Sequence, residues 1–102
     1  MPTMVQAGIY SAVLHYLKAV EALKSDDAPK VIAKMKEMPT DDPLFGKGRI
    51  RADGRKIHDA YLVEVKKPSE SKGPWDYYKI LATIPADKAF RPEKEGDCPL
   101  VK

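Results

Sequence analysis

Two stretches decide the fold of this chain: Phe45-Gly46-Lys47-Gly48-Arg49-Ile50-Arg51-Ala52-Asp53-Gly54-Arg55 and Ala60-Tyr61-Leu62-Val63-Glu64-Val65. Each contains a run suited to a β-strand, and the Asp53-Gly54 pair between the runs is a strong turn signal. Tyr61, Val63 and Val65 alternate with other residues, so they share one face of the second strand. The pattern predicts a β-hairpin over about residues 48–66, which indicates a fold and not a catalytic site.

The residues before the hairpin predict two helices. A first helix over about residues 4–24 follows from apolar residues at three- and four-residue spacing, whereas Ser11 and His15 lie largely on the opposite face. A second helix over about residues 29–38 begins after Asp26 and Asp27 and ends before Pro39. A loop over 40–43 follows. The apolar residues that define the first helix are Val5, Ile9, Ala12, Val13, Tyr16, Leu17, Val20 and Leu23.

The residues after the hairpin predict one more strand and an irregular tail. Residues 75–84 have apolar members on both faces, so we expect this strand to be covered on both sides. Residues 85–102 contain three prolines and several charges and are typical of an irregular tail. The predicted fold class is therefore α+β, in the order helix, helix, β-hairpin, strand, in one domain over residues 1–102.

Composition excludes several classes of protein. The chain has 102 residues, of which 43% are hydrophobic and 32% charged, as in ordinary globular domains. The longest apolar stretch, residues 5–20, is interrupted by Gln6, His15 and Lys18, so neither a transmembrane helix nor a signal peptide fits. The net charge of +3 is spread along the chain, and the single cysteine, Cys98, has no intrachain disulfide partner.

The residues that suggest catalysis or metal binding have simpler structural explanations. Ser11 and His15 lie four residues apart on one helix, but no orienting acid or oxyanion site accompanies them, so a surface pair is favoured. His15, His58 and Cys98 lack the short spacing of zinc ligands. We expect no catalytic residue, no metal and no cofactor.

The residues that suggest anion or nucleic-acid binding also have simpler structural explanations. Gly46-Lys47-Gly48 lacks the strand and the Lys-Ser/Thr pair of a phosphate loop. A basic group at the turn, made of Arg49, Arg51, Arg55 and Lys56, is suited to a nucleic-acid backbone, although outward-pointing charges at an edge strand are commoner. Trp75, Tyr77 and Tyr78 are more typical of packing than of base stacking.

The order of these motifs carries a family resemblance. The series is Pro2, then Gly8-x-Tyr10-x-Ala12 in a long helix, Asp26-Asp27, Phe45-Gly46, Arg51-Ala52-Asp53-Gly54 and Tyr61-Leu62-Val63-Glu64-Val65. It resembles the C-terminal part of ABC transporter substrate-binding proteins of the leucine/isoleucine/valine-binding, or extracellular ligand-binding receptor, type. The resemblance implies a single C-terminal fragment, residues 1–102, of an α/β two-lobed periplasmic-binding fold.

The resemblance also implies a function and a location. It implies a non-catalytic, periplasmic receptor that captures amino acids or related small carboxylates and delivers them to ABC permease subunits. By resemblance, the ligand-facing side chains are Met4, Val5 and Gln6, ahead of and at the start of the long helix, with Tyr10 as a weaker candidate. This chain is expected to contact the ligand only together with the rest of the receptor.

Two alternatives from other classes accompany this interpretation. The first is a freestanding small basic α+β domain that binds nucleic acid through the Arg49/Arg51/Arg55 hairpin; the receptor hypothesis expects no nucleic-acid partner. The second is an assembly module. Because the apolar residues outnumber the surfaces that this short chain offers to cover them, self-association of the fragment is expected.

Overall fold

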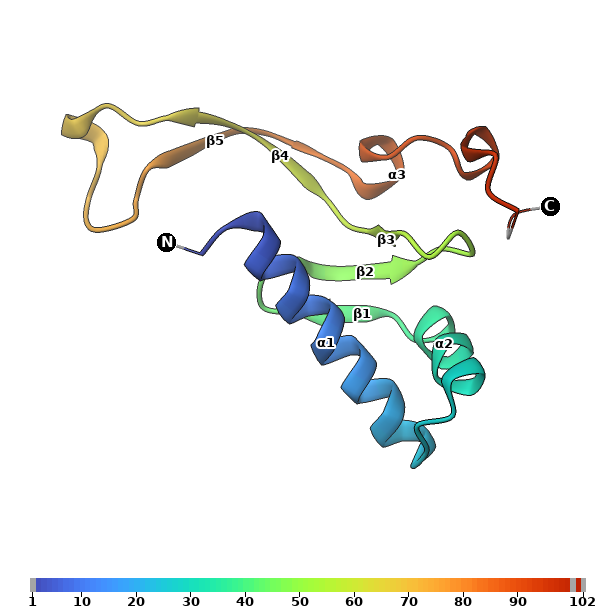
Figure 1. Cartoon of the computed structure of the whole chain (residues 1–102). Coiled ribbons are helices and arrows are strands. Elements are labelled where there is room, and N and C mark those ends of the chain that lie inside the picture. The colour runs from blue at the N-terminus through green and yellow to red at the C-terminus, as the bar shows by residue number, and fades with distance from the viewer. Residues whose placement is uncertain (1, 100, 102) are drawn as a thin grey trace.

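The computed structural model describes residues 2–99 and 101 and contains helices and two small sheets (Figure 1). The helices are α1 (Met4–Leu23), α2 (Ala28–Glu37) and the short α3 (Ala86–Ala89). The strands are β1 (Thr40–Asp42), β2 (Gly46–Ile50), β3 (Lys56–Ile57), β4 (Ala60–Val65) and β5 (Tyr78–Ile84). This mixed arrangement confirms the α+β class.

The two long helices begin and end at local sequence signals. Thr3 caps α1, since its hydroxyl accepts from the backbone N–H of Gln6 while the Gln6 side chain accepts from the backbone N–H of Thr3. Asp27 caps α2 by accepting from the backbone N–H of Lys30 at 3.2 Å. The predicted bounds of both helices are confirmed to within a residue at each end.

The three-stranded sheet has the order β1–β2–β3, and both pairs are antiparallel. The predicted turn is confirmed, because Arg51 and Arg55 are hydrogen-bonded across it and Gly54 has φ +83°, a conformation that glycine adopts readily. The prediction of a loop over 40–43 was wrong for Thr40–Asp42, which forms β1 and pairs with β2.

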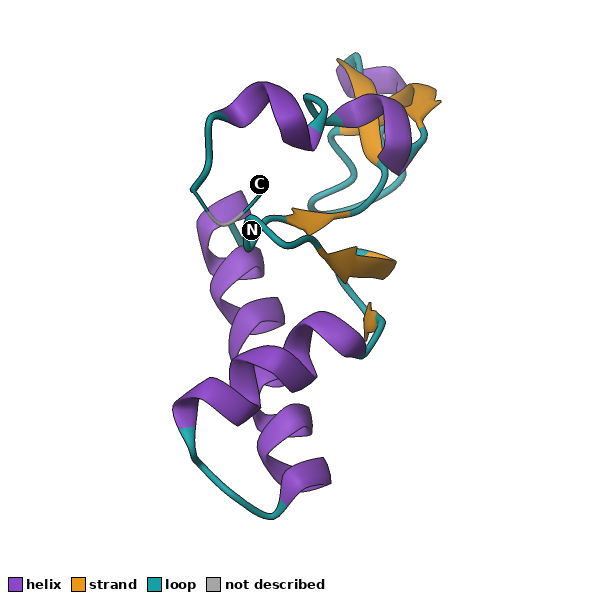
Figure 2. Ribbon diagram, turned by 90° about the vertical axis from the view of Figure 1, so that its right-hand side faces the viewer, coloured by secondary structure: helices purple, strands orange, loops and turns teal. Residues whose placement is uncertain are grey.

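The predicted return strand of the hairpin was also wrong. The strand that pairs with β2 after the turn is only Lys56–Ile57, whereas Ala60–Val65 pairs with β5. Six residue pairs hold β4 to β5, with a register shift between Leu62 and Val63. β4 and β5 therefore form a separate two-stranded ribbon, which extends away from α1 and α2 (Figures 1 and 2).

The final strand and the tail differ in detail from the prediction. β5 begins at Tyr78 and not at residue 75, and all seven of its residues are exposed, so the expected cover on both sides is not supplied within the chain. In the described part of the tail, residues 85–99 and 101, the chain is irregular apart from α3 and a 3₁₀ turn over Glu93–Gly96.

The face of α1 that packs within this chain is the reverse of the predicted one. The buried residues of α1 are Ser11, His15 and Ala19. The helix packs against α2 and β1; Ser11 contacts Asp42 of β1, and His15 contacts Met35 of α2. The expected apolar face is exposed: Val5, Ile9, Val13 and Leu17 retain between 51% and 65% of their accessible surface. Buried apolar residues of the described chain are Ala19, Val31 and Ile57, a very small core.

Candidate functional site

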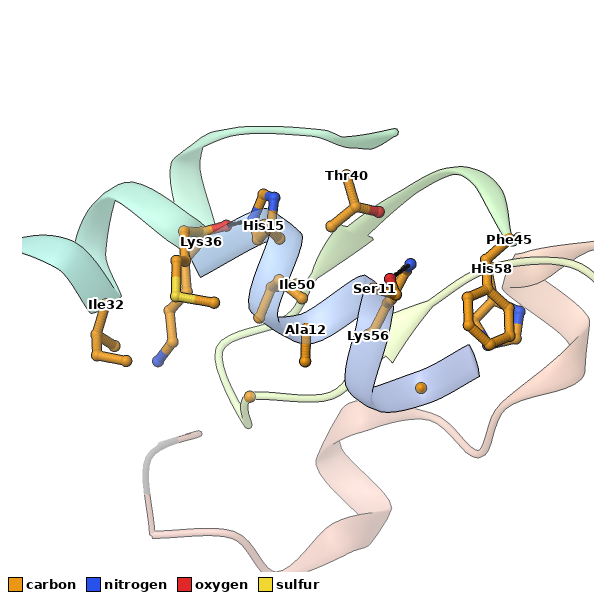
Figure 3. A pocket seen from close by; sticks show the side chains of 13 residues that line it. Ser11, Ala12, His15, Ile32, Lys36, Thr40, Phe45, Ile50, Lys56 and His58 are labelled. Carbon is orange, nitrogen blue, oxygen red and sulfur yellow. Dashed lines mark hydrogen bonds between the residues drawn. The ribbon is translucent and has the colours of Figure 1, made fainter. Parts of the chain in front are cut away.

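A cavity of about 350 Å³ lies between α1, α2 and the three-stranded sheet (Figure 3). Most of its lining is apolar, including Ala12, Ile32 and Ile50, and this composition is typical of small-molecule sites. The polar side chains that line it are Ser11, His15, Lys36, Thr40, Lys56 and His58.

Ser11, Asp42 and Lys56 form a hydrogen-bonded cluster at the edge of this cavity. The ammonium of Lys56 donates to Asp42 Oδ2 at 2.6 Å and also to the Ser11 hydroxyl. Ser11 in turn donates to Asp42 Oδ2 at 2.6 Å. Because the three residues come from α1, β1 and β3, the cluster ties the helix to two strands of the sheet.

Asp42 is held as a carboxylate. Its burial by itself would raise the pKa of this carboxyl, but hydrogen bonds from Lys56 and Ser11 lower it. The backbone N–H groups of Phe45 and Leu44, each 2.9 Å from Asp42 Oδ1, act in the same direction. Because four donors surround this carboxylate, their combined effect outweighs that of burial and leaves the pKa of Asp42 well below its usual range.

This cluster does not have the chemistry of a nucleophile. A serine nucleophile needs a base that takes its proton, and a lysine serves as that base only when it is neutral. Here Lys56 is an ion-pair partner of Asp42 and acts as a donor to Ser11. The cluster therefore acts as a polar link that stabilises the packing of α1 on the sheet.

His15 has a structural partner of its own. Its Nε2 donates to the main-chain carbonyl of Met35 at 2.8 Å, which joins α1 to α2. The expected Ser11–His15 surface pair was wrong, because both side chains are buried and bind different groups. Thr40 is buried beside them, and its hydroxyl has no hydrogen-bond partner among the described residues.

Aromatic rings pack at the end of the cavity where the two sheets meet. The rings of Phe45 and His58 have centroids 4.5 Å apart, and Phe90 meets His58 edge-on at 5.5 Å. The Lys56 ammonium lies 4.6 Å from the centroid of Phe45. His58 thus contacts both the helix–sheet part and the tail, and its ring is engaged in packing.

The four residues expected to face ligand lie elsewhere, on the first turns of α1. Met4 and Val5 are exposed, at 82% and 65%, and Gln6 forms the helix cap with Thr3. Tyr10 is half exposed and lies in a shallow apolar groove along α1 with Ile9, Val13, Leu14 and Leu17. None of the four lines the cavity described above.

The basic residues of the turn are mostly engaged with the chain itself. Arg51 is paired with Asp53 and donates to the carbonyl of Arg91 at 2.9 Å. Arg55 lies 6.0 Å from the centroid of Phe90. Lys56 points inward to Asp42, so the expectation that it points outward was wrong. Arg49 is exposed and its side chain has no partner among the described residues. One free arginine does not favour the nucleic-acid alternative, because a phosphate-binding surface needs several free cations.

The Asp42–Lys56 pair is the feature that sequence reasoning missed. Asp42 precedes Pro43 and suggested only a loop, and the two residues are fourteen positions apart.

Across residues 2–99 and 101 no group of three or more potential metal ligands occurs, and no helix in the same ranges is both long and apolar enough to cross a membrane. Trp75 and Tyr77 contact each other edge-on at 6.0 Å.

The chain is similar to known proteins in both sequence and fold. A sequence family described as "Periplasmic binding protein" matches residues 1–74. Among curated proteins, no match to the chain was found.

Two solved structures resemble the whole chain. A periplasmic binding protein from Burkholderia mallei is 57% identical, with a TM-score of 0.91. A branched chain amino acid ABC transporter periplasmic ligand-binding protein from Burkholderia xenovorans is 49% identical, also with a TM-score of 0.91. Each match covers 100% of this chain but 27% of the other chain, so this chain spans about a quarter of the length of those proteins.

Proposed function

Because this chain belongs to the periplasmic binding protein family, we propose that it forms the C-terminal part of the receptor of an ABC importer for amino acids or related small carboxylates. Family members are non-catalytic ligand binders, so the prediction that the chain is not an enzyme is confirmed. The observation that carries the proposal is the match of all 102 residues, at 57% identity and with a TM-score of 0.91, to a solved periplasmic binding protein.

The proposed ligand class has the support of one relative. The Burkholderia xenovorans protein is described as a branched chain amino acid ABC transporter component, which supports amino acids as the first candidates. The proposed receptor acts in the periplasm and passes its ligand to permease subunits. No observation on the described residues favours a second function over this one.

The proposed ligand-facing residues are Met4, Val5, Gln6 and Tyr10. Met4, Val5 and Gln6 are on the first turn of α1, where the positive end of the helix dipole favours a ligand carboxylate, and Tyr10 is on the second turn. Gln6 accepts from Thr3 through its oxygen, and its NH₂ group donates to none of the described residues and remains as a donor to a ligand. The rest of the pocket is supplied by parts of the receptor that this chain does not contain.

A hybrid protein tests the proposal. This chain replaces the matching 27% of the Burkholderia mallei protein, and calorimetry measures binding of branched-chain amino acids, aromatic amino acids and small carboxylates. We expect the hybrid to bind at least one ligand, and the isolated chain to bind none measurably, because it supplies only one wall of the pocket. A folded hybrid that binds nothing, or micromolar binding by the isolated chain, would contradict the proposal.

A further inference from the structure

The tail of the chain folds back onto the turn between β2 and β3. Arg51 donates from Nη1 to the main-chain carbonyl of Arg91 at 2.9 Å, and the backbone N–H of Asp53 donates to Glu93 Oε1 at 3.3 Å. Each of these bonds joins residues that are 40 positions apart in the sequence. Figure 1 shows the tail beside this turn. The turn and the tail therefore form one unit within the chain.

A polar hollow of about 330 Å³ lies between the turn and the tail. Its charged lining is three arginines and one aspartate, so the net charge of the lining is positive: Arg51, Arg55, Arg91 and Asp53. Charged side chains of this kind are almost never fully buried unless they are paired, so they belong to a solvent-facing surface. The hollow is made by contacts within this chain and does not depend on apolar surface that lacks a cover.

Two of the three arginines keep their hydrogen-bond donors free. Arg51 is engaged, since it is paired with Asp53 and donates to the tail. Arg55 lies over the ring of Phe90, 6.0 Å from its centroid, a contact that involves the charge of the guanidinium but none of its N–H groups. Among residues 2–99 and 101, the side-chain N–H groups of Arg55 and Arg91 have no acceptor, and neither side chain forms an ion pair.

The two carboxylates nearest to these arginines are bound by other donors. Asp53 accepts from the Arg51 side chain and, at 3.0 Å, from the backbone N–H of Arg55. Glu93 accepts from the backbone N–H of Asp53. Both carboxylates therefore stabilise the turn and its contact with the tail. They leave the guanidinium groups of Arg55 and Arg91 as a pair of cations without a carboxylate partner in the described chain.

We propose that Arg55 and Arg91 bind a small, doubly charged oxyanion, the phosphate group of inorganic phosphate or of a small phosphate monoester, between the turn and the tail. A guanidinium presents its donors in a planar fork that matches phosphate oxygens two at a time. The two positive charges match the charge of about −1.5 to −2 on a phosphate group near neutral pH. The hollow is larger than one phosphate group, so it also admits a small organic substituent.

This site is separate from the two functions already weighed. It lies on the turn and the tail, whereas the residues proposed to face an amino acid lie on α1, and it does not rest on the receptor assignment. A nucleic-acid backbone needs a row of cations that neutralises several phosphates in succession. One pair of arginines around one hollow suits a single small anion.

Binding should also hold the tail in place. Arg55 belongs to the turn and Arg91 to the tail, so an anion held by both joins the two segments. Lys94 follows Arg91 in an exposed 3₁₀ turn, which makes the peptide bond after Lys94 a trypsin site. Phosphate should therefore slow cleavage after Lys94 in the wild-type chain, and should not slow it in Arg91→Gln.

Calorimetry measures the affinity directly, on the 102-residue chain and on the hybrid, in phosphate-free buffer with about 0.15 M NaCl, where long-range attraction to surface charge is largely screened. We expect inorganic phosphate and glycerol phosphate to bind, and acetate to bind at least about tenfold more weakly. Arg55→Gln and Arg91→Gln should each weaken phosphate binding roughly tenfold or more. Arg49→Gln removes the same charge from a residue outside the hollow and should change the affinity less than about twofold.

Each outcome supports or overturns the site. Phosphate binding that persists in folded Arg55→Gln and Arg91→Gln would overturn it, as would an equal loss in Arg49→Gln, tryptic cleavage that phosphate does not slow, or the absence of phosphate binding. Glycerol phosphate that binds more tightly than inorganic phosphate would assign the monoester as the ligand; the reverse order would assign the free ion.

The result is independent of the proposed function, because amino acid binding is measured on the same hybrid. A hybrid that binds an amino acid but no phosphate supports the receptor proposal and contradicts the anion site. A hybrid that binds phosphate through Arg55 and Arg91 but no amino acid or carboxylate supports the anion site and contradicts the receptor proposal.

Discussion

Lys56 and Asp42 form an ion pair, with 2.6 Å between Nζ and Oδ2, in the part of the molecule where α1 meets the sheet. Asp42 is almost fully buried, and Ser11 binds both partners. A buried carboxylate is tolerated only when donors surround it, so the link between helix and sheet depends on Lys56.

Replacing Lys56 by methionine should strongly destabilise the chain, because it leaves Asp42 buried without its cation. The expected loss in free energy of unfolding is about 3 kcal/mol, the lower end for buried pairs, since Lys56 is partly exposed. Urea unfolding followed by circular dichroism measures it. Lys30→Met is the control, because Lys30 and Asp27 form an exposed pair at 3.9 Å, whose loss should cost less than about 1 kcal/mol. Equal losses for the two variants would show that the cluster has no special role.

Acid should destabilise the chain below about pH 4. The folded-state pKa of Asp42 lies below its unfolded value, so the stability that it contributes is complete above the unfolded pKa and is lost as the pH falls through the folded pKa. The pKa values of Asp53 and Asp76 are also lowered, by hydrogen bonds from Arg51 and Lys66. Urea midpoints between pH 7 and pH 3 measure the effect. Asp42→Asn should give a less stable protein with a shallower decline; an unchanged slope would contradict the assignment.

Two glycine substitutions should have opposite effects. A Cβ at Gly48 would overlap the carbonyl oxygen of Ile57 and lie 2.8 Å from the Thr40 hydroxyl, so Gly48→Ala should destabilise the sheet by at least roughly 1–3 kcal/mol. A Cβ at Gly8 would have no atom within 4 Å, so Gly8→Ala should stabilise α1 by about 0.5–1 kcal/mol. Thermal unfolding of both variants tests the pair, and a tolerated Gly48→Ala would refute the close approach of β1, β2 and β3.

The isolated chain should self-associate at micromolar concentration. Burial of a large apolar side chain is worth about 1.5–3 kcal/mol, and α1 and the β4–β5 ribbon each expose several such side chains. Sedimentation velocity over a concentration series measures this, and Val13→Glu should shift the distribution toward monomer. A monomer with cooperative unfolding at every concentration would contradict this prediction.

Cys98 should react with thiol reagents under native conditions. It is a free thiol of intermediate exposure in the irregular tail. Oxidation should then give a disulfide-linked dimer on non-reducing gels, and Cys98→Ser should abolish that band while leaving non-covalent association intact. A thiol that is labelled only after unfolding would show that the tail buries it.

Local signals in the sequence determined the helices and one turn. Asp27, Pro29 and Pro39 act on their own backbone neighbours, so the bounds of α2 were predictable from those residues. Gly54 likewise specified the turn, because the conformation at φ +83° strongly favours glycine. The family resemblance rested on the order of such local motifs, and the match to residues 1–74 confirms it.

Only the tertiary structure decided which surfaces and strands meet. Alternation marked Ala60–Val65 as a strand but could not choose between β2 and β5 as its partner, since both offer backbone hydrogen bonds. Periodicity marked the apolar stripe of α1, yet the face that packs within this chain is the one with Ser11 and His15. Asp42 and Lys56 meet across fourteen residues, and the apolar side chains Ile9, Val13 and Leu17 of α1 stay exposed. Periodicity shows which side chains favour burial, whereas long-range contacts decide what buries them.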